Sequence, residues 1–259
     1  MKNIVLEKFR TGAPCAGTFV HILYGAAVAA LGQTGLDYVI IDNEHGPVGL
    51  ETAARLIESA KGAGLCPFVR INAIERGQIL KMLDAGAMGL IVPQVHTPDE
   101  VRELISYAKF RPLGNRGYCP SADGGWGCGE EYEGGMAGYM EEANEKTLVI
   151  PQCETAECLE NIEEILSIDG VSGIFIGPYD LSIALGIPGS FDAPAHKAAV
   201  EKIKKACEAA GKLCIIYCDN AEKGAEYIRQ GFQNVTVGID IISLMGAAKD
   251  IADAVHESV

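Results

Sequence analysis

The chain has 259 residues and a formal net charge of −14, from 21 Lys and Arg against 35 Asp and Glu. A chain this acidic, with no basic cluster, is a poor candidate for binding nucleic acid or an anionic membrane surface. Hydrophobic residues make up 48% of the sequence, which is enough for a packed core and excludes bulk disorder.

The cellular setting is predicted from the N-terminus and the cysteines. The first ten residues carry charges where a signal peptide needs an apolar run, and no stretch approaches the roughly 18 apolar residues of a membrane span. The nine cysteines are an odd number and form no CxxC pair. Both observations favour reduced thiols in a cytoplasmic protein.

Eight short apolar runs, rich in β-branched residues, alternate along the chain with longer amphipathic runs. The predicted strands are 15–20, 38–42, 67–71, 89–93, 147–154, 173–177, 213–218 and 234–238. They are apolar almost throughout, as strands covered on both faces must be.

Helical patterns fall between these strands. Thr97 is followed by a proline and two carboxylates, which is typical of a helix start, and predicts a helix from there to about Lys109. The other predicted helices cover residues 50–63, about 75–84, 156–167, 194–210, 221–230 and 243–256.

Eight βα units in about 250 residues are what a (β/α)8 TIM barrel requires. The sequence therefore predicts an α/β protein with one (β/α)8 barrel domain over residues 1–259. The main alternative is a doubly wound open sheet, but residues 12–17 do not supply the Gly-rich phosphate turn that it needs after its first strand. A long Gly-rich loop at about 111–138 breaks the alternation, and irregular stretches of this length are usually functional or form an interface.

Polar side chains gather where the predicted strands end. They are Asp42, Glu44, His45, Arg70, Asn72, Gln152, Glu154, Tyr179, Asp180, Tyr217 and Asp219. Because the carboxyl ends of barrel strands meet at one face, we expect them to form one site. Each also has a plainer interpretation: Asp180 or Glu154 as a helix cap, His45 as a turn residue, and Arg70 as a surface ion pair.

These residue types limit the chemistry of the site. Two carboxylates without a Cys or His partner at ligand spacing suit a hard cation such as Mg²⁺ or Mn²⁺. An arginine beside such a cation can hold a developing enolate, and a histidine can act as general acid or base. Together they indicate enolate chemistry at a 2-oxo acid. No lysine stands out at a strand end, which argues against a Schiff-base aldolase.

Several motifs occur together in the order of a known family. They are DNEHGP at 42–47, LDAGA at 83–87 with VPQV at 92–95, PLGNRG at 112–117, QCE at 152–154 and GPYDLS at 177–182. Over nearly its whole length the chain resembles the HpcH/HpaI family of class II, metal-dependent pyruvate aldolases. The type member of that family cleaves a 4-hydroxy-2-oxoheptanedioate.

The resemblance implies a role for each site residue. Glu154 and Asp180 would carry a divalent metal (Mg²⁺, Mn²⁺ or Co²⁺). Arg70 would contact the pyruvate carbonyl oxygen and stabilise the enolate, and His45 would transfer protons with support from Asp42 and Glu44. The substrate pocket would be lined by Phe19, Arg70, Gln152, Gly177, Pro178, Tyr179 and Tyr217. Tyr179 and Tyr217 depart from the family pattern, so the identity of the aldehyde stays open.

The expected reaction is retro-aldol cleavage of a 4-hydroxy-2-oxo acid to pyruvate and an aldehyde. The substrate would be of the 2,4-dihydroxyhept-2-ene-1,7-dioate type or derived from a sugar acid. The alternatives are a citrate-lyase-β-like enzyme acting on CoA thioesters and a non-catalytic paralogue that binds an oxo acid. Because the family forms homohexamers, Arg116, Gly117 and Tyr118, and also Asp84, are expected to contribute to the aldehyde pocket of a neighbouring subunit.

Overall fold

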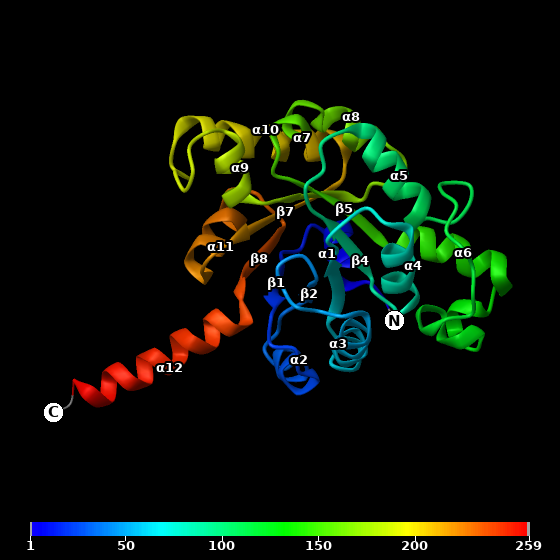
Figure 1. Cartoon of the computed structure of the whole chain (residues 1–259), viewed down its shortest axis with the longest axis horizontal. Coiled ribbons are helices and arrows are strands. Elements are labelled where there is room, and N and C mark those ends of the chain that lie inside the picture. The colour runs from blue at the N-terminus through cyan, green and yellow to red at the C-terminus, as the bar shows by residue number, and fades with distance from the viewer. Residues whose placement is uncertain (1, 258–259) are drawn as a thin grey trace.

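The computed structural model describes residues 2–257, in which eight parallel strands form a closed barrel (Figure 1). Each strand pairs with the next along the chain, and β8 closes the barrel by pairing with β1. The strands are β1 (Cys15–Val20), β2 (Tyr38–Asp42), β3 (Cys66–Arg70), β4 (Gly89–Val92), β5 (Leu148–Cys153), β6 (Gly173–Ile176), β7 (Leu213–Cys218) and β8 (Asn234–Ile239). The predicted (β/α)8 barrel is confirmed, and every predicted strand end lies within one residue of the observed one.

Most of the helices follow strands and cover the outside of the barrel, whereas α1 precedes β1 and α12 extends away from the barrel. They are α1 (Ile4–Thr11), α2 (Gly25–Leu31), α3 (Leu50–Gly62), α4 (Arg76–Asp84), α5 (Pro98–Ala108), α6 (Gly135–Lys146), α7 (Ala156–Glu160), α8 (Ile162–Ser167), α9 (Pro178–Ala184), α10 (Pro194–Ala210), α11 (Ala221–Arg229) and α12 (Asp240–His256). The helix predicted over 156–167 is two helices, because Asn161 between α7 and α8 leaves the helical conformation. Helices α1, α2 and α6 were not predicted from the sequence.

The interior of the barrel is packed and forms no pore. Tyr38 is fully buried, its ring stacks on Phe68 at 5.2 Å, and its hydroxyl donates a hydrogen bond to the carbonyl of Val235 at 2.8 Å. Gly17 makes room for this ring, since a Cβ there would lie 2.4 Å from it. Val5 of α1 is buried against the same cluster. These residues fill the N-terminal end of the barrel, and the site is expected at the opposite end, where the strands terminate.

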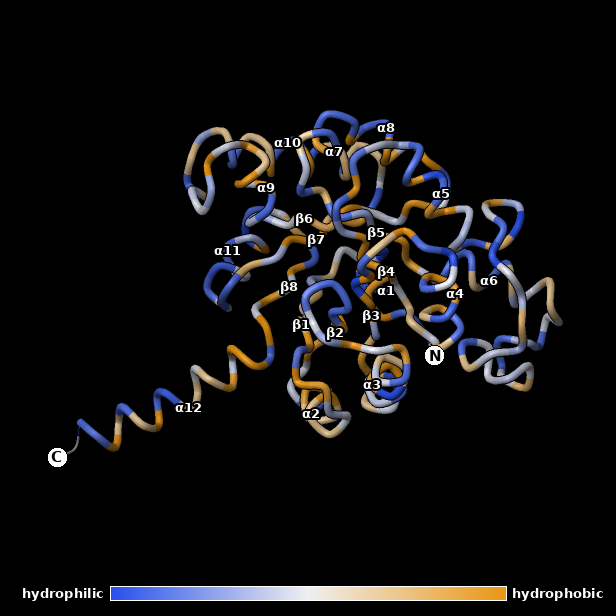
Figure 2. Tube along the Cα trace, viewed as in Figure 1, coloured by the Kyte–Doolittle hydropathy of each residue, from blue (hydrophilic) through white to orange (hydrophobic). Residues whose placement is uncertain are grey.

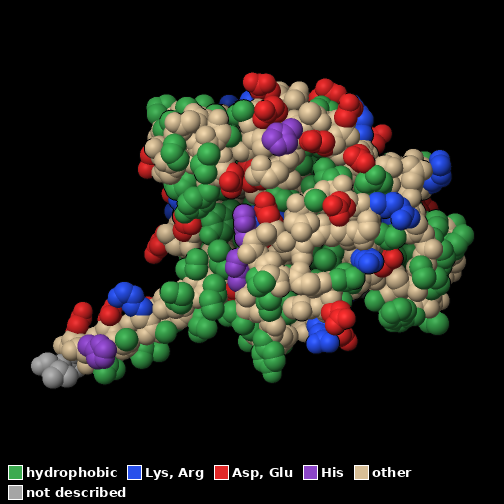
Figure 3. Space-filling model, in the orientation of Figure 1, with side chains coloured by type: hydrophobic (Ala, Val, Ile, Leu, Met, Phe, Trp, Pro, Cys, Tyr) green, Lys and Arg blue, Asp and Glu red, His purple; other side chains and the backbone are tan. Residues whose placement is uncertain are grey.

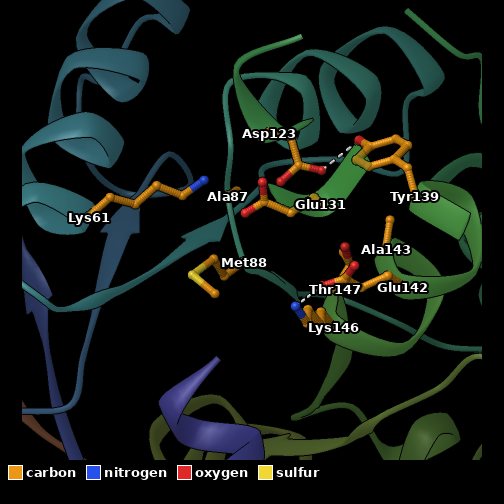
Figure 4. Close-up of a pocket in the computed structure, with 10 residues that line it drawn as sticks. All are labelled: Lys61, Ala87, Met88, Asp123, Glu131, Tyr139, Glu142, Ala143, Lys146 and Thr147. Atoms are coloured by element: carbon orange, nitrogen blue, oxygen red, sulfur yellow. Dashed lines mark hydrogen bonds and ion pairs between the residues drawn. The ribbon is translucent and has the colours of Figure 1, made fainter. Parts of the chain in front are cut away.

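The segment predicted as a loop at 111–138 contains ordered structure. It includes two 3₁₀ turns, η1 (Ala122–Gly127) and η2 (Glu130–Tyr132), and the start of α6. Tyr139 of α6 stacks on Tyr132 at 4.6 Å and donates a hydrogen bond to Asp123 at 2.9 Å, as the dashed line in Figure 4 shows. With Met88, which precedes β4, Asp123 and Tyr139 line a small cavity of about 40 Å³. The segment thus lies at the N-terminal end of the barrel.

Helix α12 extends away from the barrel (Figures 1 and 2). It begins at Asp240, three residues before the predicted start, and every described residue after Asp240 is exposed. Among residues 2–257, no helix has both the length and the apolar character needed to cross a membrane.

Candidate active site

A pocket of about 370 Å³ opens at the carboxyl ends of the strands. Its lining residues are Phe19, His21, Asp42, His45, Arg70, Gln152, Phe175, Gly177, Pro178, Tyr179, Asp180, Tyr217, Asp219, Ile239 and Ile242. Most of the site residues predicted from the strand ends therefore meet at one place, because the closed barrel brings its strand ends together.

Arg70, at the end of β3, is held from three directions. Its Nε and Nη2 donate to the two carboxylate oxygens of Asp42 at 2.8 and 2.7 Å, and Nη1 lies 3.2 Å from Glu44. Its guanidinium also lies 4.5 Å above the ring of Phe19. The side chain is only 11% exposed, so the surface-ion-pair interpretation is wrong. A guanidinium has five N–H donors, so those that Asp42 and Glu44 leave free can serve a ligand.

Asp42 is the centre of this network. Burial alone would raise the pKa of its carboxyl, but the hydrogen bonds and charge of Arg70, with further help from His21, lower that pKa to about 2. Its Oδ1 also accepts hydrogen bonds from the backbone N–H groups of Glu44 and His45 at 3.1 and 3.4 Å. The carboxylate therefore stays ionised and orders both Arg70 and the turn that carries His45.

Glu154, directly after β5, is 2% exposed. One carboxylate oxygen accepts hydrogen bonds from the backbone N–H and side-chain amide of Gln94, at 2.8 and 3.0 Å, and the other accepts one from the Gln152 amide. Burial is the main cause that raises the pKa of Glu154 to about 7; the negative charges of Asp180 and Glu44 act in the same direction, and the hydrogen bonds from Gln94 and Gln152 act against it.

The helix-cap interpretations of the two acids are wrong. The cap of α7 is Thr155, whose hydroxyl accepts from the backbone of Cys158 at 3.1 Å, so Glu154 is free for another role. In α9 the N-cap is Gly177, and Asp180 lies inside the first turn.

The oxygen-rich end of the pocket fits a hard divalent cation. The side-chain oxygen of Gln152, next to Glu154, is buried without a hydrogen-bond partner. The charges of Asp180 and Glu44 raise the pKa of Glu154, the charge of Asp180 raises that of Glu44, and a cation would offset this repulsion. Within residues 2–257, no group of three or more His, Cys, Asp or Glu side chains is placed to hold a metal ion.

Two histidines lie in the pocket, and only one was predicted. The side chain of His45 is 63% exposed, and its Nε2 lies 3.7 Å from Glu44, beyond hydrogen-bond distance. The missed one is His21, whose Nε2 lies 2.8 Å from the Oδ2 of Asp42. His21 comes directly after the last residue of β1. A polar residue at the end of a predicted strand is the criterion by which the other site residues were predicted, so the same criterion could have identified His21.

Aromatic side chains form the other wall of the pocket. The Tyr179 hydroxyl donates to the carboxylate of Asp219 at 2.9 Å, and the Tyr217 ring lies 5.9 Å from Phe19 and 6.2 Å from Tyr179. Burial and the charge of Asp219 raise the pKa of both phenols, so both stay protonated hydrogen-bond donors near neutral pH.

The residues predicted to serve a neighbouring subunit lie at the other end of the barrel. Arg116 is 1% exposed, its Nη2 lies 2.9 Å from Asp84, and its guanidinium covers the ring of Phe110 at 4.7 Å. Gly117 packs near Arg76. Tyr118 is exposed, and its hydroxyl accepts a hydrogen bond from Tyr132 at 2.8 Å. None of the four predicted residues lines the chain's own pocket.

The fold and the pocket define a (β/α)8-barrel enzyme with an arginine and several carboxylates at the strand ends. A family model described as HpcH/HpaI aldolase/citrate lyase matches residues 16–247. The chain belongs to the HpcH/HpaI aldolase/citrate lyase family.

Similar proteins agree with this assignment. The 4-hydroxy-2-oxo-heptane-1,7-dioate aldolase of Salmonella arizonae is 31% identical, with 97% of this chain and 94% of the relative covered. The hydroxypyruvate/pyruvate aldolase of Rhizorhabdus wittichii is 33% identical, with 97% and 98% covered. The crystal structure of an HpcH/HpaI aldolase from Desulfitobacterium hafniense superposes with a TM-score of 0.89 at 28% identity, over 98% of this chain and 96% of the other. The protein is thus an aldolase of this family, which makes it a carbon–carbon lyase.

Proposed function

We propose that this aldolase cleaves 4-hydroxy-2-oxo acids to pyruvate and an aldehyde. The observation that carries the proposal is Arg70, which Asp42, Glu44 and Phe19 fix beside an oxygen-rich pocket. A cation held against an electron-rich oxygen stabilises an enolate, and cleavage of the C3–C4 bond of such an acid produces one. The relative named for 4-hydroxy-2-oxo-heptane-1,7-dioate supports the substrate class.

The carboxylates of Glu154 and Asp180 hold a divalent cation, Mg²⁺, Mn²⁺ or Co²⁺, with the buried oxygen of Gln152 beside them. When bound, this cation polarises the 2-oxo group as a Lewis acid. Arg70 directs its remaining N–H groups at the oxygen that becomes negative. Gly177 and Pro178 shape the pyruvate end of the pocket.

His45 acts as an acid/base group that protonates C3 of the enolate. Its turn is ordered because Asp42 accepts hydrogen bonds from the backbone of both Glu44 and His45, while its exposed ring can exchange protons with water. Phe19, Tyr179 and Tyr217 face the aldehyde half of the substrate, and the phenol groups favour an aldehyde with polar substituents.

We also infer that the protein works in the cytoplasm as a homo-oligomer, with a hexamer as the expected size. An apolar groove of about 910 Å³ lies outside β1 and β8, between α2 and α11, where the helix following β8 belongs in a barrel. Helix α12 instead exposes a row of apolar side chains (Figure 3): Ile241, Ile242, Leu244, Met245, Ile251 and Val255. The α12 helix of a second copy fits this groove, because apolar surfaces of this size are normally covered.

The proposed reaction is tested with metal-stripped protein, pyruvate and a panel of aldehydes. Carbon–carbon bond formation, followed by NMR, should appear on addition of Mg²⁺, Mn²⁺ or Co²⁺ and disappear with a chelator. Full activity in the chelator, after verified metal removal, contradicts the proposed metal dependence. Turnover of CoA thioesters without any aldol product would favour the citrate-lyase-β-like alternative. The absence of all turnover, with an oxo acid still bound, would favour the non-catalytic one.

A further inference from the structure

The second histidine of the pocket, His21, is held more firmly than His45. Its backbone N–H donates to Asp240 at 2.8 Å, and the N–H of Ile22 donates to the same carboxylate at 3.0 Å. Its ring nitrogen Nε2 lies 2.8 Å from Asp42 Oδ2. The start of α12 and the end of β2 therefore fix both the backbone and the ring of His21.

The partner of His21 determines which ring nitrogen carries the proton. Asp42 is fully buried and ionised, so it can only accept a hydrogen bond. A neutral His21 must then be protonated at Nε2, which leaves a lone pair on Nδ1. Among residues 2–257, no group forms a hydrogen bond with Nδ1, and the side chain keeps 24% of its surface exposed as part of the pocket lining.

This arrangement resembles the pair in which a buried carboxylate orients a histidine base. The ring of His45 is not held in this way, because its Nε2 lies 3.7 Å from the carboxylate of Glu44, beyond hydrogen-bond distance. His21 lines the same pocket as Phe19, which comes two residues earlier at the end of β1 and lies against the Arg70 guanidinium that shares Asp42 with His21. Phe19 was assigned above to the aldehyde half of the substrate, whose oxygen is the C4 hydroxyl before cleavage.

We propose that His21 is a further catalytic residue: its Nδ1 removes the proton of the C4 hydroxyl during retro-aldol cleavage. This inference rests on the proposed function. As the proton moves to Nδ1, the electron pair of the O–H bond forms the aldehyde C=O. The C3–C4 bond breaks, and its electron pair forms the enolate, whose oxygen Arg70 holds. C3 then receives a proton from His45, and both rings exchange protons with water to regain their starting states.

The test compares two reactions that need different protons. In His21→Gln the amide can still donate to Asp42, but no basic nitrogen remains. The substrate is the aldol adduct that wild-type protein forms fastest in the aldehyde panel. We expect kcat for its cleavage to fall by about 10²-fold or more in this variant. The second reaction is exchange of the pyruvate methyl protons in D₂O, which is monitored by ¹H NMR in the presence of Mg²⁺. It involves no C4 hydroxyl, so the exchange rate of the variant should stay within about threefold of the wild-type rate. His96→Gln, outside the pocket, is the matched control.

The outcomes separate this inference from the proposed function. If wild-type protein forms no aldol adduct with any of the three metals, the proposed function fails. If wild-type protein is active and His21→Gln keeps more than a third of its activity, His21 is structural. Equal losses of cleavage and exchange would also overturn the inference, because they would mean that His21 acts only through Arg70. Independently of activity, ¹⁵N NMR of the neutral His21 ring should show Nε2 protonated and Nδ1 bare, and the reverse tautomer would contradict the base role.

Discussion

At the scale of single residues, Asp42 connects the parts of the site. It binds Arg70 through two hydrogen bonds, pairs with His21, and accepts the backbone N–H of His45. Since its carboxyl is fully buried, each of these partners also offsets the cost of removing the charge from water. The same carboxylate therefore supports both stability and chemistry.

This predicts a stability effect that depends on pH. The pKa of Asp42 is about 2 in the folded chain, against an ordinary value of 3.8. Because the pKa is lower in the folded chain than in the unfolded chain, the ionised carboxylate stabilises the folded protein at pH values above the unfolded-state pKa. This stabilisation, about 2 kcal/mol, is lost as the pH falls from about 4 to about 2. Urea unfolding of wild type and Asp42→Asn should show a difference in unfolding free energy that shrinks over this range. A difference that stays constant down to pH 2 would contradict the prediction.

His45 is expected to serve a different proton from His21. His45→Ala should lower kcat for cleavage by about 10²–10⁴-fold and should also abolish most of the methyl-proton exchange of pyruvate. Metal binding, measured by calorimetry with Mn²⁺, should be unchanged because the ring forms no hydrogen bond or ion pair with Glu154 or Asp180. A loss of activity below about threefold would make His45 a turn residue.

At the scale of elements, the junction of β6 and α9 holds the carboxylate end of the pocket. Gly177 lies at this junction, where a Cβ would lie 2.7 Å from the Glu154 carboxylate and 2.8 Å from the Gln152 amide. Gly177→Ala should therefore displace both side chains, weaken Mn²⁺ binding by about tenfold or more, and lower activity in parallel.

The control for this variant is Gly62→Ala in α3, where a Cβ would meet nothing within 4 Å. It should bind Mn²⁺ like the wild type and be as stable or slightly more stable, since alanine favours a helix over glycine. Unchanged Mn²⁺ affinity in Gly177→Ala would show that this junction does not limit the site.

At the scale of the whole molecule, α12 is the least supported part of the chain. A helix exposing this many apolar side chains gains little from its own barrel, since helices are held mainly by packing of their apolar face. Ile251→Glu should therefore reduce the oligomer mass measured by light scattering at micromolar concentration. Lys249→Gln changes the net charge by the same amount on the same helix and should leave the mass unchanged. An unaltered mass in Ile251→Glu would exclude α12 from the interface.

Shared active sites are tested by mixing two inactive variants. Asp180→Ala removes a proposed metal ligand, and Tyr118→Ala removes an exposed side chain that is predicted to contribute to a neighbour's aldehyde pocket. If subunits share sites, mixed oligomers contain some sites with both groups intact, and activity should reappear. No recovery in verified mixed oligomers, with each parent inactive alone, would place Tyr118 outside a neighbour's site.

Much of the barrel and the membership of its site could be predicted from the sequence. Strand positions follow from short apolar runs, which are local, and the barrel rule then places Arg70, Gln152 and Asp180 at one end. The helix start at Thr97 was also predictable, because its capping box with Glu100 involves residues three positions apart.

Only the tertiary structure decided how these residues are paired. Asp42 binds His21, and Glu154 binds Gln94, across 21 and 60 positions of sequence, so each pair depends on how the strands are aligned around the closed barrel. Gln94 reaches Glu154 from a left-handed backbone conformation that its residue type does not predict. The direction of α12 could not be predicted from the sequence either, because a helix that covers its own barrel has the same apolar pattern as one that covers the barrel of another subunit. Local patterns determine where elements and polar ends lie, whereas contacts between distant residues exist only once the chain has closed on itself.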